Sequence, residues 1–242
     1  MIKLERTSTF NWEGAIRGMR NAMNSWDKSD SRICSCDIGE VCHMVLDGGK
    51  PACEFEFVPY CIGKNDLDLM KRLAKAGSDH RKYMRQIFVS VDITAPLYWW
   101  KEFDTYKVGT TANSTSTMHT IHKKEFTLDD FSFEHLLNEY TCDHGYNPMW
   151  VVSHTLDILN HYRVKYTKAK EGHGRIGEAD GSWWQMIQLL PSSYNQKRTV
   201  TMNYENLVNM YHARKAHKLD EWHKFCDWIK ELPYSEIITG DE

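Results

Sequence analysis

One segment of the chain alternates strictly between apolar and polar positions, and this segment constrains the fold class most strongly. From Ile87 to Ile93 every second residue is Ile or Val, and Phe, Ser and Asp lie between them. A period of two is typical of a strand with one face on a core. Helical patterns precede and follow this strand. We therefore expect one α+β domain over residues 1–242, in which a small mixed sheet packs with several helices.

Apolar residues recur at helical spacing on both sides of the strand. We expect one helix after Asn11 and another after Asn65, with these residues as N-caps and Gly77 as the stop of the second helix. Pro96 is expected to begin a short aromatic helix that reaches Phe103. Further helices are expected over residues 131–140, 148–170, 181–190, 203–215 and 218–231.

The segment of residues 30–63 interrupts these patterns. Its turn cluster, Asp47-Gly48-Gly49-Lys50-Pro51, separates two possible short strands, so we expect a hairpin inserted at the surface of the domain. The segment also contains Cys34, Cys36, Cys42 and His43. This composition is typical of a zinc site, but the spacing matches no standard zinc finger, and we assign no metal site.

Charge and composition exclude several classes of protein. Thirty Lys and Arg against 33 Asp and Glu give a net charge of −3, which argues against a broad nucleic-acid-binding surface. No apolar run reaches the roughly 18 residues of a membrane-spanning helix, and the N-terminus lacks the apolar core of a signal peptide. Seven scattered cysteines favour reduced thiols. We expect a cytoplasmic protein with no membrane and no nucleic-acid polymer as partner.

One face of the expected 203–215 helix combines polar and apolar side chains. Asn203 and Arg214 are eleven residues apart, which brings them within about 20° of the same face, together with Leu207, Met210 and Tyr211. An inward guanidinium costs several kcal/mol unless an anionic group meets it. That group is either a carboxylate in a buried salt bridge or an anionic or enolate-like oxygen of a ligand.

The segment from Leu190 to Arg214 resembles, without a gap, the C-terminal signature of flavin-dependent thymidylate synthases. The signature begins with a Leu-Pro pair, here Leu190-Pro191, and has an Asn twelve residues after the Pro, here Asn203. A later Asn or His and a final Arg correspond to Asn209 and Arg214.

The resemblance extends upstream in the same order. His80 precedes the 87–93 strand, Ala95-Pro96 follows it, and the polar loop after the aromatic helix matches part of the family's hallmark motif. Anchored on Asn113, that loop offers Thr111 and Ser116 for the two serines of the hallmark.

The resemblance implies a homotetramer and a reaction: methylation of dUMP, or modification of a related pyrimidine nucleotide. It implies FAD as cofactor, with NADPH and methylenetetrahydrofolate as co-substrates. Arg214 would be the catalytic residue, lying against the pyrimidine ring. Residues at the substrate would be Thr111, Asn113, Ser116 and Arg214, and residues at the flavin would be His80, Asn203 and Asn209.

Several of the family's phosphate-binding arginines have no counterpart in this chain. Read without a gap from Asn113, Tyr106-Lys107-Val108 lies where the family has Arg-His-Arg; shifted back onto the aromatic helix, these positions hold Glu102-Phe103-Asp104. Ile187 and Glu205 replace two further arginines. These losses favour an alternative hypothesis, a catalytically inactive homologue that binds a nucleotide or a protein partner. Substitute cations are available, unless they form a solvated face: Lys107, His119, His122, Lys123 and Lys124, or Lys197 and Arg198.

Overall fold

The computed structural model describes residues 2–33, 60–140, 145 and 147–240. The chain divides into two compact units, which we describe separately. The α7 unit comprises Ile2–Ile93, Asp104–Asn113 and Thr199–Glu242, and the α5–α6 unit comprises Thr94–Phe103 and Ser114–Arg198. The single domain expected from the sequence stays a prediction.

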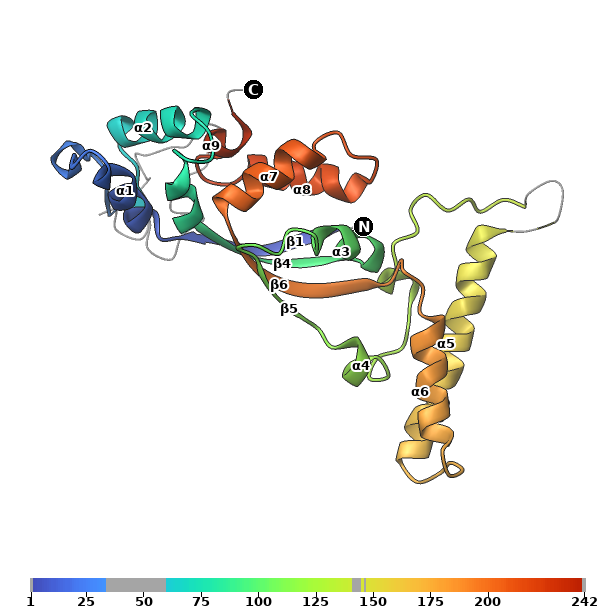
Figure 1. Cartoon of the computed structure of the whole chain (residues 1–242). Coiled ribbons are helices and arrows are strands. Elements are labelled where there is room, and N and C mark those ends of the chain that lie inside the picture. Colours follow the sequence, from blue (N-terminus) through green and yellow to red (C-terminus); the bar gives the residue numbers. More distant parts are fainter. Residues whose placement is uncertain (1, 34–59, 141–144, 146, 241–242) are drawn as a thin grey trace, which may run out of the picture. The chain divides into compact units, whose positions relative to one another are not determined.

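A four-stranded sheet runs through the structure in the order β1-β4-β6-β5 (Figure 1). Its central strand β4 (Phe88–Pro96) confirms the alternating segment, since Val89, Val91 and Ile93 are almost fully buried. The sequence did not predict the other three strands. These are β1 (Lys3–Phe10), β5 (Thr111–Ser114) and β6 (Asn195–Asn203).

A second, two-stranded sheet joins the ends of the expected insertion. Strand β2 (Arg32–Ile33) pairs antiparallel with β3 (Tyr60–Cys61). The turn cluster and Cys34, Cys36, Cys42 and His43 lie outside the described residues. The hairpin therefore stays a prediction, although the two segments that flank it are paired.

Helices of the α7 unit pack around a core rich in aromatic side chains. Trp12 lies edge-on to Tyr204 and to Tyr234, with ring centroids 5.1 and 5.3 Å away. Helix α7 contacts η3, α8 and α9, while α2 contacts α9. The elements are α1 (Trp12–Asn21), η1 (Trp26–Lys28), α2 (Lys64–Lys75), η3 (Lys82–Gln86), α7 (Tyr204–Arg214), α8 (Asp220–Lys230) and α9 (Glu236–Thr239).

Two expected helix caps are replaced by other interactions. Asn11 precedes α1 but makes no side-chain cap; instead its amide donates to the Gln86 carbonyl oxygen at 2.8 Å. Helix α2 begins one residue before Asn65, because the Asp30 carboxylate accepts hydrogen bonds from the amides of Asn65 and Asp66 at 2.9 and 3.1 Å. A distant carboxylate thus satisfies the first turn, as a local cap otherwise would.

The α5–α6 unit has its own core between two paired helices, α5 (Pro148–Lys170) and α6 (Glu178–Leu189) (Figure 1). Its other helices are α3 (Leu97–Phe103), α4 (Thr117–Thr120) and η4 (Leu128–Asp130). The buried core residues of this unit are Ile121, Phe126, Phe131, Leu156, Leu159 and Met186.

No helix in the described ranges is both long and apolar enough to span a membrane.

The expected helix over residues 131–140 is wrong. Phe131 forms an isolated β-bridge with Tyr194, and the Ser132 amide donates to the Ser193 carbonyl oxygen at 2.8 Å. These long-range backbone hydrogen bonds hold the start of the segment extended, and a turn follows at Phe133–Leu136, where the apolar spacing favours a helix. Tertiary contacts thus override weak local propensity.

A buried ion pair anchors α1 to α2. Arg20 is 5% exposed and Asp66 is fully buried, and Arg20 Nε donates to Asp66 Oδ1 at 2.6 Å. The hydroxyls of Ser29 and Ser31 donate to the other carboxylate oxygen at 2.7 and 2.6 Å. Burial raises the pKa of Asp66, but the hydrogen bonds from Ser31, Ser29 and Arg20 together lower it below its ordinary value.

We expect Asp66→Ala to lower the free energy of unfolding by roughly 3–5 kcal/mol, because it leaves the Arg20 guanidinium buried without its carboxylate. The folded-state pKa of Asp66 is depressed, so its stabilisation is present above an unfolded-state pKa of about 3.9 and is lost as the pH falls through the folded-state value. Urea unfolding at neutral and acid pH measures both effects. Asp68→Ala, at an exposed position of the same helix, is the control; equal losses for the two variants would contradict this role.

Candidate functional site

The N-terminus of α7 is built around Asn203, an expected flavin-binding residue. Asn203 Oδ1 accepts a hydrogen bond from the Asn206 amide at 2.9 Å, and Asn206 Oδ1 accepts one from the Asn203 amide at 3.2 Å. This reciprocal pair caps the helix. Gly109 lies against it with a φ of 78°, and a Cβ there would be only 2.7 Å from Asn203 Nδ2. A glycine is therefore required where this loop meets the cap.

The C-terminus of α7 carries Arg214, whose guanidinium is held by two aromatic side chains. Its Nε donates to the Tyr106 hydroxyl at 2.9 Å, and its central carbon lies 4.8 Å from the centre of the Trp222 ring. The Tyr106 ring centre is 5.5 Å away. Arg214 is half-buried and Trp222 is fully buried, so the cation is fixed against a rigid surface within its own unit.

Glu205 lies where the family signature has an arginine, and it is buried in a charge cluster. The cluster consists of Glu205, 8% exposed, with Arg85 and Arg81, whose Nε is 3.4 Å from the carboxylate. Burial raises the pKa of Glu205, but hydrogen bonds and charge from Arg85 and then Arg81 outweigh this and lower it. Two cations that could meet a phosphate are thus paired with an acid.

The other two flavin candidates are exposed. The turn that follows α2 contains His80, whose backbone amide donates to the Gly77 carbonyl oxygen at 3.0 Å. Asn209 lies six residues after Asn203, about 120° around the helix, so the two amides do not share one face. Helix geometry thus separates these two members of the flavin set in a single chain.

The substrate candidates fall in both units. Thr111 and Asn113 are exposed and lie two residues apart on β5, and therefore on the same face of the strand, in the α7 unit. Ser116 belongs to the α5–α6 unit, where its side chain caps α4 by accepting a hydrogen bond from the His119 amide at 3.1 Å. Their role at a substrate stays a proposal.

Several substitute cations of the α5–α6 unit have partners of their own. Lys124 is paired with Asp130 at 2.7 Å. The Arg198 guanidinium stacks over the Trp100 ring, 4.1 Å from its centre. His122 packs on Tyr166, and burial, followed by the charges of Lys123 and Lys170, lowers its pKa. The expected cationic patch is therefore partly used in local packing.

The diphosphate of a flavin dinucleotide needs positive, preferably bidentate donors. At the positions where the family has arginines, Tyr106 binds Arg214, Ile187 packs against the α5–α6 core, and Glu205 is paired with arginines. The residues at these three positions therefore do not fit the diphosphate. The sequence analysis did not predict that Tyr106 and Trp222 contact Arg214. The only indication in the sequence was that one aromatic residue precedes the polar loop with Asn113 and another follows Arg214.

No protein-family profile and no curated protein matches the chain. Thymidylate synthase X (ThyX) from Helicobacter pylori with FAD and dUMP matches with a TM-score of 0.60 at 13% identity, covering 100% of this chain and 98% of that one. Another structure of this flavin-dependent enzyme with FAD and dUMP has a TM-score of 0.59 at 14% identity, covering 98% of both chains.

The UMP/dUMP methylase PolB from Streptomyces cacaoi, bound with 5-Br dUMP, has a TM-score of 0.54 at 14% identity. The match covers 99% of this chain and 94% of that chain. The chain therefore has the fold of flavin-dependent thymidylate synthases. The expected α+β fold class and the expected structural resemblance are confirmed.

We expect Glu205→Gln to lower the free energy of unfolding by about 1.5–3 kcal/mol, because charged hydrogen bonds to Arg81 and Arg85 become neutral ones. Glu205→Arg, which introduces the residue of the family signature, should cost more, since it places a third cation in the cluster. Urea unfolding measures both. Asn209→Ala, exposed on the same helix, should change the free energy by less than about 0.5 kcal/mol. An unchanged stability of Glu205→Arg would contradict the cluster's role.

Proposed function

We propose that this protein binds a pyrimidine nucleotide and that Arg214 recognises the base. The observation that carries this proposal is the guanidinium fixed by the Tyr106 hydroxyl and the Trp222 ring. A cation held in place loses little side-chain entropy when a ligand binds, so more of its interaction energy contributes to affinity.

The chemistry of Arg214 suits a pyrimidine ring. A guanidinium is planar, remains charged and presents its donors in a fixed fork, which can meet a carbonyl oxygen of a flat heterocycle. It also favours the ionised or enolate form of the base over the neutral form, by placing positive charge where negative charge develops. Exposed polar groups of Thr111 and Asn113, which belong to the same unit as Arg214, would contact the sugar and phosphate.

The structural neighbours support this choice of ligand. Two of them were crystallised with dUMP, and the third with a brominated dUMP. Their fold extends over nearly the whole chain, and Arg214 is the retained final arginine of the signature. Nucleotide binding is required by the enzyme hypothesis and is one of the two options, beside a protein partner, in the alternative hypothesis.

A second candidate function is methylation of the same nucleotide, dUMP or a relative, with FAD, NADPH and methylenetetrahydrofolate. The match over 98–100% of both chains to ThyX structures that hold FAD favours it. FAD would supply the redox chemistry. Since the residues at those three positions do not fit its diphosphate, a second copy in a homotetramer would have to supply cations, alongside His80, Asn203 and Asn209.

We expect Arg214→Ala to weaken dUMP binding at least about 30-fold, and Arg214→Lys to have an intermediate effect, because lysine keeps the charge but loses the fork. Tyr106→Phe should weaken binding about three- to tenfold, since it removes the hydroxyl that orients the guanidinium. Isothermal titration calorimetry on the full chain measures these affinities.

The free energy of unfolding of the same variants shows whether Arg214 is needed for ligand binding or for the stability of the fold. Loss of the two cation–aromatic contacts in Arg214→Ala should cost about 1–2 kcal/mol, whereas a broken buried salt bridge would cost about 3–5 kcal/mol. Wild-type affinity for dUMP in Arg214→Ala would contradict the proposal. Added FAD discriminates the candidates: a shifted visible band and thermal stabilisation support methylation, and their absence supports binding without turnover.

A further inference from the structure

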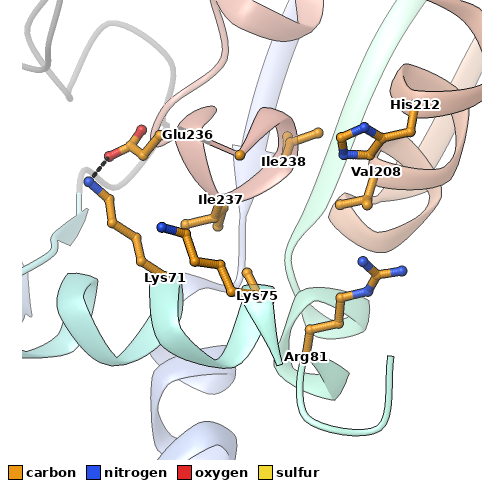
Figure 2. A pocket seen from close by; sticks show the side chains of 10 residues that line it. Lys71, Lys75, Arg81, Val208, His212, Glu236, Ile237 and Ile238 are labelled. Atoms are coloured by element: carbon orange, nitrogen blue, oxygen red, sulfur yellow. Dashed lines mark ion pairs between the residues drawn. The ribbon is translucent and has the colours of Figure 1, made fainter. Parts of the chain in front are cut away.

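A cavity of about 160 Å³ lies within the α7 unit, lined by residues of α2, α7, α9 and the turn before η3. Figure 2 shows the long side chains of Lys71, Lys75 and Arg81 around it, with His212 opposite and Glu236 paired to Lys71. None of the residues that we assign to the nucleotide lines it.

The sequence brings these groups together by simple helical spacing. Lys71 and Lys75 are four residues apart and therefore share one face of α2. Val208 and His212 are likewise four apart on α7. Because both pairs line the same cavity, two helices contribute basic groups to one hollow, above an apolar wall that includes Ile237.

Positive charge dominates the lining. Among the described residues, three basic side chains, Lys71, Lys75 and Arg81, line the cavity together with one acid, Glu236. Lys71 Nζ lies 3.4 Å from Glu236, and Arg81 Nε lies 3.4 Å from Glu205, which is outside the lining. Such a set of cations in a concave site of reduced solvent exposure attracts a compact dianion more strongly than a singly charged group.

The volume restricts the size of the ligand. A cavity of about 150 Å³ holds a molecule as large as benzene, whereas sites for drug-sized ligands exceed about 300 Å³. A phosphate group with a short aliphatic substituent fits within this volume, whereas a whole nucleotide would extend beyond it into solvent.

We propose that this cavity is a binding site for a small phosphate-bearing anion, either inorganic phosphate or the phosphate of a short aliphatic monoester. The Nη groups of Arg81, whose Nε faces Glu205, would donate to phosphate oxygens, and Lys71 and Lys75 would contribute charge. The site is separate from the proposed nucleotide site: His212 and Arg214 are two residues apart on α7, about 200° around the helix.

The test is calorimetric titration of the full chain with inorganic phosphate and with methyl phosphate, at an ionic strength held constant with chloride. Both ligands should bind, and Lys71→Gln/Lys75→Gln should weaken binding about tenfold or more. Arg72→Gln is the matched control, since Arg72 is a cation on the same helix that does not line the cavity. The single Lys75→Gln variant serves if the double variant does not fold.

An opposite effect makes the test specific. Glu236→Gln removes the acid that competes for Lys71, so it should strengthen phosphate binding about two- to fivefold. Arg214→Ala should leave phosphate binding unchanged, which separates this site from the nucleotide site. The proposal fails if phosphate does not bind beyond the chloride control, or if Arg72→Gln weakens binding as much as the double variant. It also fails if Glu236→Gln weakens binding, or if dUMP binds more tightly than methyl phosphate through Lys71 and Lys75.

Discussion

Helix α7 is buried on more than one face, so each polar side chain that is withdrawn from solvent on it or at its ends has to be satisfied by a partner inside the protein. Asn203 is satisfied by the reciprocal cap with Asn206, Glu205 by arginines from the η3 region, and Arg214 by Tyr106 and Trp222. Buried polar groups that lack partners are costly, and these pairings therefore fix where α7 lies in its unit. The position of the candidate site follows from that requirement.

The same requirement explains why the chain keeps the fold of flavin-dependent thymidylate synthases while lacking much of their phosphate chemistry. Glu205 replaces a cation with an anion, and nearby arginines neutralise it, so the helix packs although that position no longer offers a positive charge. Arg214, in contrast, is retained, and its guanidinium lies against the rings of Tyr106 and Trp222 within the same unit. Along helix α7, the chain therefore keeps the packing of this fold although residue 205 differs in charge from the family signature.

The sequence predicted those elements whose periodicity and packing agree. Strand β4 and helices α3, α5, α7 and α8 follow from regular spacing and from Pro96 and Pro148 at helix starts. Strand β6 has an apolar alternation only at Val200 and Met202, and β5 is exposed throughout, so neither shows a strand pattern. The inward position of Arg214 could be derived from helical spacing. Its contact with Tyr106, 108 positions away, could not, because no local pattern encodes it.

A crystal structure of the full chain with dUMP tests the central claim most directly, because it locates the base relative to one guanidinium. Our account predicts nitrogen atoms of Arg214 within about 3.2 Å of a carbonyl oxygen of the pyrimidine, with the hydrogen bond from Arg214 to Tyr106 retained. A nucleotide bound with its base away from Arg214, or an Arg214 side chain that turns from Tyr106 and Trp222 to a carboxylate, would contradict it.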